Sequence, residues 1–238
     1  MNWFSSNTPL ILGHRGASAD APENTLKAFK LAIAQGAAGF EFDVQLSADG
    51  VPVVIHDHKV NRTTNGSGSV HKMTLEELKK LDAGEGETIL TLEEVFKTFG
   101  DQILYNIEIK DDSWRNQGTE AAVGRLIKQY GVQTNCLVTS FNPMAMRRGR
   151  DVIPAETPMG MIRMMVPQKY SYHLFSGQAD HPHYWLVTPE YMKWAAKRGY
   201  RIHVWTVDDP AIAKRLTTLG VHGLITNKPQ FIREQLAL

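Results

Sequence analysis

GFEFDVQLSADGVPVVIHD, residues 39–57, carries the pattern that decides the fold. Apolar and polar residues alternate through its first half, which is typical of a β-strand with one apolar face and one polar face. Asp49-Gly50 then separates this run from a second apolar run, and this predicts an antiparallel hairpin. The polar face of the first strand carries two carboxylates in a row, Glu41 and Asp43. A surface strand would more often carry Thr, Lys or Ser there, so the two acids indicate a site.

Short apolar runs alternate with amphipathic segments along the rest of the chain. The expected strands are 10–14, 39–45, 104–110, 136–141, 159–164, 184–188, 201–207 and 223–227. Helix starts lie between them, such as Asn142-Pro143 and Asp209-Pro210, where an N-cap residue precedes a proline. Repeated strand–helix units predict a parallel sheet covered by helices. The number of strands, and a length near the about 250 residues typical of such barrels, favour a TIM (β/α)8 barrel over an open sheet.

We expect one catalytic domain over residues 1–238. The second arm of the hairpin should fold back over the mouth of the barrel. A small lid-like insertion should follow it at about 58–90, where NRTTNGSGS is rich in loop-forming residues. The segment 165–183 contains Pro167, Gly177 and Pro182, so we expect a weak helix or an irregular loop there.

Composition and charge exclude several classes of function. The 26 basic and 25 acidic residues give a formal net charge of +1, so no global field favours nucleic acid. No apolar run approaches the roughly 20 residues needed to span a bilayer, and no signal-peptide pattern precedes residue 10. The single Cys136 fits a reducing compartment. We therefore expect a cytoplasmic protein without stable membrane insertion and without a nucleic-acid partner.

Charged side chains gather where the expected strands end. The carboxyl ends of barrel strands face one mouth, where active sites lie. The residues expected there are His14, Arg15, Glu41, Asp43, Glu108, Lys110 and Trp205, with His56 and Asp57 added by the hairpin. Three carboxylates, two imidazoles and two basic groups should thus converge on one cavity.

This set of residues has a simple electrostatic interpretation. Side chains two residues apart on a strand can reach one central ion, and crowded carboxylates repel unless they take up protons or a cation. Oxygen ligands favour Mg²⁺ or Ca²⁺ over zinc. A cation flanked by Arg15 and Lys110 would suit a phosphate, and His14 and His56 could supply a general acid and base.

The signature blocks make the sequence familiar. HRGASADAPENTLKAF (14–29), EFDVQLSADGVPVVIHD (41–57) and NIEIK (106–110) resemble those of the glycerophosphodiester phosphodiesterases, of the compact bacterial cytosolic type. RTTNGSG (62–68), LDAG (81–84), TSF (139–141) and VWTV (204–207) continue the resemblance over nearly the whole chain. The resemblance implies a TIM-barrel hydrolase that cleaves glycerophosphodiesters, such as glycerophosphocholine or glycerophosphoethanolamine, to sn-glycerol 3-phosphate and an alcohol.

The resemblance also implies roles for individual residues. It assigns His14 and His56 as the acid/base pair, with His14 as acceptor and His56 as donor. The metal ligands are Glu41, Asp43 and Glu108, the substrate-binding residues are Arg15, Lys110 and Trp205, and the candidate partners that orient them are Glu23, Asn24 and Asp57. Glu23 and Asn24 have a structural alternative as the start of a helix. Asn227 stands where the family usually has Asp, which leaves its polar contact open.

Two other functions remain compatible with this pattern. The same barrel could act on lysophospholipids or a phosphatidylinositol-type lipid, which a wide apolar rim would favour, although the polar 58–90 segment does not suggest one. A non-catalytic barrel that binds glycerophosphodiesters would have lost a ligand or a histidine, and none is lost here. The sequence leaves open the alcohol, Mg²⁺ versus Ca²⁺, water versus the glycerol 2-hydroxyl as nucleophile, and the oligomeric state.

Overall fold

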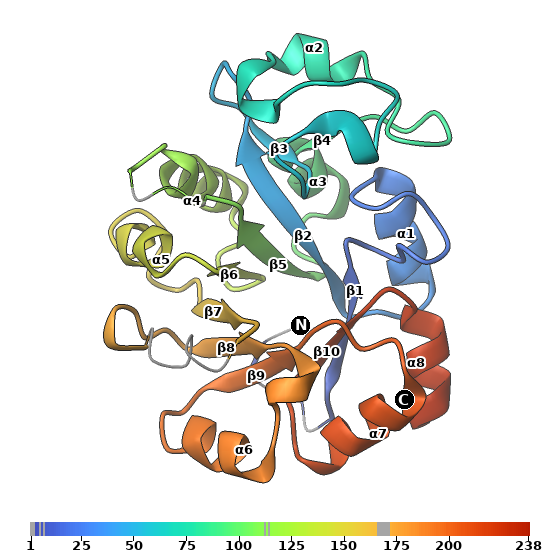
Figure 1. The fold of residues 1–238 in the computed structure, drawn as a ribbon, viewed down its shortest axis with the longest axis vertical. Coiled ribbons are helices and arrows are strands. Elements are labelled where there is room, and N and C mark those ends of the chain that lie inside the picture. Colours follow the sequence, from blue (N-terminus) through green and yellow to red (C-terminus); the bar gives the residue numbers. More distant parts are fainter. Residues whose placement is uncertain (1–2, 5, 7, 112, 114, 166–171) are drawn as a thin grey trace.

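Eight parallel strands form a closed barrel in the computed structural model, which describes residues 3–238 except 5, 7, 112, 114 and 166–171 (Figure 1). The barrel strands are β1 (Leu10–His14), β2 (Gly39–Leu46), β5 (Leu104–Ile109), β6 (Cys136–Ser140), β7 (Met159–Arg163), β8 (Ala179–Pro182), β9 (Arg201–Val204) and β10 (Gly223–Thr226). Each pairs in parallel with its neighbour, and β1 pairs with both β10 and β2, which closes the ring. The predicted fold class is confirmed.

Helices cover the outside of this ring. They are α1 (Leu26–Ala34), α3 (Leu92–Phe99), α4 (Thr119–Tyr130), α5 (Pro143–Gly149), α6 (Pro189–Ala196), α7 (Pro210–Thr218) and α8 (Pro229–Leu236). The expected caps are present: the side chains of Asn142 and Asp209 accept hydrogen bonds from the first turns of α5 and α7. These local signals fix where each helix begins, and hence where each strand meets its loop.

The alternation in β2 separates two environments. Phe40, Phe42 and Val44 point outward into a core shared with the covering helices, where Phe40 stacks on Phe29 of α1. The intervening Glu41 and Asp43 therefore face the barrel interior. The period of two predicted from the sequence thus places both acids on one side of one strand.

The hairpin and the segment after it lie beyond the ring. β3 (Pro52–Val54) pairs antiparallel with β2 as predicted, and β4 (Leu90–Thr91) pairs with β3. Between them lie η1 (Val60–Arg62), η2 (Val70–Lys72) and α2 (Leu75–Lys79), at the top of Figure 1. Buried Val60, Val70 and Leu78 give this segment a small apolar cluster of its own.

One predicted strand is wrong. Residues 184–188 are not a barrel strand, because Tyr184–Leu186 form the 3-10 helix η4 and the strand is β8 instead. The polar residues Asp180 and His181 make the sequence of β8 resemble a loop. In the structure, Asp180 pairs with Arg163 on β7, and His181 contacts His203 inside the barrel. Part of the expected 165–183 segment, residues 166–171, lies outside the described residues.

Trp3 closes the end of the barrel opposite the site. Its ring is fully buried against Leu10, Leu104 and Leu137, near the starts of three strands, and its Nε1 donates to the carbonyl of Asn135 at 2.9 Å. A side chain before the first strand therefore completes the interior packing.

Replacing Trp3 with alanine should destabilise the fold. Truncating a buried aromatic residue costs about 3–5 kcal/mol, because the surrounding side chains cannot fill the cavity. We expect Trp3→Ala to lower the free energy of unfolding by this amount in urea titrations. Trp3→Phe should lose less, and equal stability of Trp3→Ala and wild type would contradict the packing described here.

Candidate active site

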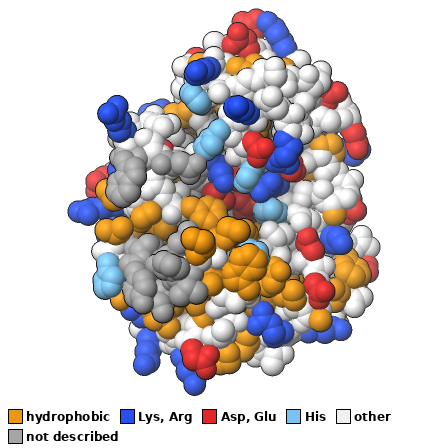
Figure 2. Space-filling view, in the orientation of Figure 1, with side chains coloured by type: hydrophobic (Ala, Val, Ile, Leu, Met, Phe, Trp, Pro, Cys, Tyr) orange, Lys and Arg blue, Asp and Glu red, His pale blue; other side chains and the backbone are white. Residues whose placement is uncertain are grey.

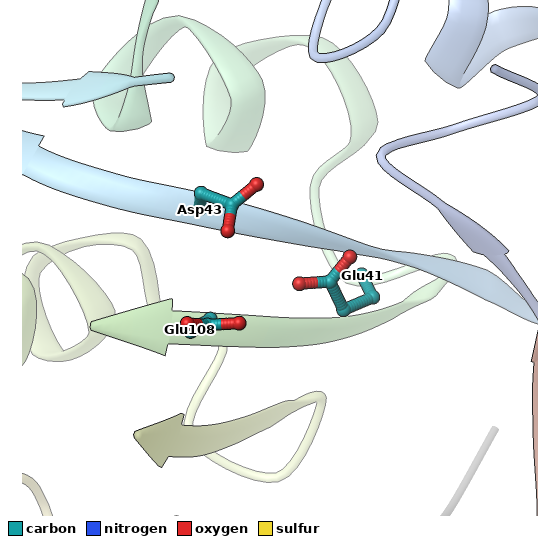
Figure 3. Close-up of side chains that lie close together, drawn as sticks. All are labelled: Glu41, Asp43 and Glu108. Carbon is teal, nitrogen blue, oxygen red and sulfur yellow. The ribbon is translucent and has the colours of Figure 1, made fainter. Parts of the chain in front are cut away.

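Three buried carboxylates meet inside the barrel, two from β2 and one from β5 (Figure 3). The register places Asp43 opposite Glu108 and Glu41 opposite Asn106. One carboxylate oxygen from each of Glu41, Asp43 and Glu108 lies within 4.8 Å of the other two. The adjacent acids seen in the sequence are thus two parts of a three-carboxylate cluster.

Burial and mutual repulsion shape the charge of this cluster. Both effects raise the pKa of Glu41 well above its usual value, and burial together with Asp43 raises the pKa of Glu108 to about 7. Lys110 Nζ lies 2.8 Å from Glu108 Oε1, and Arg15 Nε lies 3.4 Å from Asp43 Oδ2. Two cationic side chains only partly offset three crowded acids.

The donor set fits a divalent cation. Asp43 Oδ1 is buried, and among the described residues no donor forms a hydrogen bond with it. Lys110 Nζ lies 3.9 Å from this oxygen, beyond hydrogen-bond distance. A buried carboxylate oxygen without a hydrogen bond is costly, and hard cations such as Mg²⁺ and Ca²⁺ bind oxygen ligands of this kind. Glu41, Asp43 and Glu108 could therefore hold one divalent ion.

His14 ends β1 beside the cluster. Its Nδ1 donates to Asn227 Oδ1 at 2.7 Å, while the amide of Asn227 donates to Asp208 Oδ2 at 2.5 Å and is thereby oriented. The Nε2 of His14 consequently faces the cluster, 3.9 Å from Glu41 Oε2. Burial, reinforced by the charge of Arg15, lowers the pKa of His14 to about 4. The imidazole is then neutral near neutral pH, with Nε2 able to accept a proton.

His56 follows β3 and approaches from the hairpin side. Its Nδ1 donates to Asp57 Oδ1 at 2.6 Å, which directs Nε2 toward Lys110 Nζ at 3.2 Å. Gln45, the next polar residue on the inner face of β2, donates to the carbonyl oxygens of Ile55, His56 and Asp57 at 2.9–3.1 Å. The predicted hairpin therefore does bring His56 to the mouth, and Gln45 holds its loop in place.

Arg15 is held by the first loop of the barrel. Its Nη1 donates to Glu23 Oε1 at 2.9 Å, and Asn24 Nδ2 donates to Asp43 Oδ2 at 3.0 Å. Arg15 and Asn24 both have left-handed backbone angles, with φ of 55° and 59°, which are uncommon for residues other than glycine. This strained loop turns both residues that were predicted as orienting partners, Glu23 and Asn24, toward the charged centre.

A cavity of about 220 Å³ opens above these groups, and its lining includes both histidines, Arg15, Glu41 and Glu108. Its other wall is apolar and contains Phe141, Ile162, Met164 and Trp205. Trp205 lies edge-on to Phe141 and donates from Nε1 to the carbonyl of His181 at 2.8 Å. Figure 2 shows charged side chains gathered at the opening and a hydrophobic patch beside them.

The site also contains residues that the sequence did not single out. Asp208 acts on His14 through Asn227, and Phe141 and His181 line the cavity. Arg62, in the insertion, contacts both Glu23 and Asp57. Arg62 lies in the RTTNGSG block and Phe141 in TSF, so the resemblance did include them, but it gave no reason to assign a role.

Comparison with known proteins settles the family. A family model described as the glycerophosphoryl diester phosphodiesterase family matches residues 14–231. The chain belongs to this family. It is a glycerophosphodiester phosphodiesterase, and the expected resemblance and enzyme class are confirmed.

Relatives match over nearly their full length. The chain is 40% identical to the glycerophosphodiester phosphodiesterase of Caldanaerobacter subterraneus subsp. tengcongensis over 231 residues, covering 93% of this chain and 95% of the relative. It is 34% identical to that of Bacillus altitudinis over 242 residues, covering 95% of this chain and 98% of the relative.

Solved structures agree with the barrel. An Oleispira antarctica phosphodiesterase, in complex with the product sn-glycerol-3-phosphate, matches with a TM-score of 0.87 at 33% identity, covering 97% of this chain and 98% of that chain. The Thermotoga maritima glycerophosphodiester phosphodiesterase matches with a TM-score of 0.79 at 29% identity, covering 96% and 99%. Within the described part of this chain, no helix has the length and apolar character to cross a bilayer.

A bound cation should stabilise the enzyme more at high pH than at low pH. Glu108 keeps its proton to about pH 7 when folded but only to about pH 4.5 when unfolded, so its contribution to stability is lost as the pH rises between these values. A cation that neutralises the cluster offsets this loss. We expect Mg²⁺ or Ca²⁺ to raise the melting temperature more at pH 8 than at pH 5.

Thermal melts of EDTA-treated protein, with and without added cation, measure this difference. Glu108→Gln is the matched control, because it keeps the shape but removes one charge, and it should reduce the cation-induced shift. The assignment fails if neither cation raises the melting temperature at pH 8, or if Glu108→Gln responds like wild type.

Proposed function

We propose that this enzyme hydrolyses glycerophosphodiesters such as glycerophosphocholine and glycerophosphoethanolamine to sn-glycerol 3-phosphate and the free alcohol, by a cation-dependent reaction with two histidines. The observation that carries the proposal is that His14 and His56 line the same cavity as Arg15 and two of the three clustered carboxylates, Glu41 and Glu108. The bound product of the Oleispira relative, sn-glycerol-3-phosphate, supports this choice of substrate class.

The charged residues at the mouth would bind the phosphate. Arg15 contacts Asp43, and Lys110 contacts Glu108. A divalent ion held by Glu41, Asp43 and Glu108 would neutralise the cluster and draw electron density from the phosphate oxygens. The Arg15 guanidinium would then be available to bind phosphate oxygens equally in the substrate and in the transition state, and the Lys110 ammonium would stabilise the additional charge of the transition state.

The hydrogen bond from His14 Nδ1 to Asn227 leaves Nε2 of His14 as a proton acceptor, and the family resemblance assigns the donor role to His56. His14 is neutral, with its proton on Nδ1, so Nε2 takes the proton of the nucleophile as a new P–O bond forms. The P–O bond to the alcohol then breaks, and His56 Nε2 donates a proton to the departing oxygen. For this role Nε2 of His56, which lies 3.2 Å from Lys110 Nζ, must first take up a proton, and Asp57 would stabilise the resulting imidazolium through its hydrogen bond with Nδ1.

Two nucleophiles fit this scheme. Water would give sn-glycerol 3-phosphate directly. The glycerol 2-hydroxyl would first give a cyclic phosphate, which water opens in a second step. Phosphorus NMR of a single turnover separates the routes, because only the second route forms the cyclic phosphate.

Removing either histidine should abolish most of the activity. General acid or base catalysis typically contributes about 10²–10⁴-fold, so we expect His14→Ala and His56→Ala each to lower kcat by this factor. A coupled assay for sn-glycerol 3-phosphate with glycerophosphocholine measures the loss. His71→Ala, at an exposed position of η2, is the control and should remain active. Near wild-type turnover of either active-site variant would refute its role.

Activity should require the cation. We expect EDTA-treated enzyme to lose turnover and to regain it with Mg²⁺ or Ca²⁺, because a cation would neutralise the repelling carboxylates beside the phosphate. The same coupled assay, repeated with each metal, determines which ion is preferred. Full activity in EDTA would rule out the proposed role of the ion.

One observation favours a lipid as a second candidate substrate. We define the apolar rim as Phe141, Met164 and Trp205, which line the cavity, together with Met165 and Trp185, whose neighbour Met164 accepts a hydrogen bond from Trp185 Nε1. Met165 and Trp185 are 60% and 54% exposed. Such a surface could contact an acyl chain. Comparing kcat/KM for glycerophosphocholine with that for micellar lysophosphatidylcholine and phosphatidylinositol separates the two substrate classes.

A further inference from the structure

Arg62 holds two carboxylates at once, and each of them contacts a residue of the reaction centre. Its Nη1 and Nη2 donate to the two oxygens of Glu23, both at 2.8 Å. Its Nε and Nη2 donate to the two oxygens of Asp57 at 2.7 and 3.0 Å. One planar guanidinium therefore makes two bidentate contacts, an arrangement that a lysine ammonium cannot reproduce.

The contact with Asp57 leads to His56. Asp57 Oδ1 accepts from His56 Nδ1 at 2.6 Å and from Arg62 Nη2 at 3.0 Å. A carboxylate fixed in this way can hold the imidazole in only one orientation. Without Arg62, the partly exposed side chain of Asp57 would be free to turn toward solvent, and His56 would lose its orienting partner.

The contact with Glu23 leads to Arg15. Glu23 Oε1 accepts from Arg15 Nη1 at 2.9 Å and from Arg62 Nη2 at 2.8 Å, so the two guanidinium groups share one oxygen. Arg15 in turn lies 3.4 Å from Asp43 in the carboxylate cluster. Glu23 therefore links Arg62 to the Arg15 guanidinium at the cavity, so the position of Arg62 influences the orientation of Arg15.

The backbone that carries Arg62 is anchored. Arg62 ends η1, which also contains the fully buried Val60. The Val60 amide donates to the Gly68 carbonyl at 3.0 Å, and Lys59 forms a bridge with Ser69. The insertion thus presents the guanidinium from a fixed platform, although about half of the Arg62 side chain remains exposed.

The charges of the two carboxylates agree with this geometry. Burial raises the pKa of Glu23, but the hydrogen bonds and charges of Arg62 and Arg15 outweigh this effect and lower the pKa to about 2. The hydrogen bond from Arg62 also holds the pKa of Asp57 well below its usual range. Both contacts therefore persist over the pH range in which histidines act as acid and base.

We propose that Arg62 is a positioning residue of this enzyme, which sets the orientation of His56 through Asp57 and that of Arg15 through Glu23. The proposal rests on the proposed function, in which His56 transfers a proton and Arg15 binds phosphate. It gives the insertion a role in the reaction: the platform of η1 aligns two residues that come from different strands.

Crossed variants test the two contacts separately, in steady-state assays with glycerophosphocholine and the activating cation. Arg62→Ala should lower kcat through His56 and raise KM through Arg15, each by about 10- to 100-fold, as is usual when an outer partner of a site is lost. In the Glu23→Gln background the same substitution should lower only kcat. In the Asp57→Asn background it should raise only KM.

Lys79→Ala is the matched control. Lys79 also joins the insertion to the barrel, through an ion pair with Glu94 of α3, but it contacts no residue of the cavity. It should leave kcat and KM unchanged. Arg62→Lys provides a second variant if Arg62→Ala melts below the assay temperature, and it should recover at most one of the two kinetic effects, because an ammonium cannot bind both carboxylates bidentately.

Several results would overturn the proposal. One is unchanged kcat and KM in folded Arg62→Ala. Another is that Arg62→Ala changes kcat and KM by the same factors in wild type, Glu23→Gln and Asp57→Asn. A third is full activity of Arg62→Lys when Arg62→Ala cannot be assayed. A wild-type enzyme that releases no sn-glycerol 3-phosphate from glycerophosphocholine would instead refute the proposed function. An active wild type with an unaffected Arg62→Ala refutes only the role of Arg62.

Discussion

The repulsion among three buried carboxylates is the constraint on which the rest of the site depends. Glu41, Asp43 and Glu108 are brought together by strand register. Arg15, Lys110 and Asn24 surround the cluster and partly offset its negative charge. One oxygen of Asp43 nevertheless has no hydrogen bond within the described residues. The negative charge of the cluster therefore lies where a phosphate, which is itself negatively charged, would have to bind. The same crowding that destabilises the cluster would allow it to hold a divalent cation.

Local patterns predicted much of this arrangement. The alternation in residues 39–46 determines which side chains of β2 face inward, and Asp49-Gly50 determines that the chain returns antiparallel. NIEIK repeats the alternation on β5, so Glu108 could be expected near Glu41 and Asp43. These features depend on neighbours in the sequence and on the geometry common to all barrels, and this is why they can be read without a structure.

Contacts between distant residues could not be predicted in the same way. β8 was missed because Asp180 and His181 are polar, and their partners Arg163 and His203 become neighbours only when the ring closes. Asn227 holds His14 across 213 positions, and its orientation depends on Asp208 in yet another loop. Arg62 reaches Glu23 across 39 positions. In each case the residue type does not identify its partner, and the contact can be recognised only in the folded structure.

The two histidines lie in parts of the molecule that differ in their free energy of local unfolding. His14 ends a strand that is paired on both sides within the ring, whereas His56 follows the three-residue β3, in a segment whose cluster around Val60, Val70 and Leu78 is much smaller than the barrel core. Small clusters of this kind open at lower free energy than the whole fold, which hydrogen exchange detects as a separate cooperative unit. Inactivation by heat or urea should then precede loss of the barrel, and the enzyme would pass through a state that is still folded but has only one of its histidines in place.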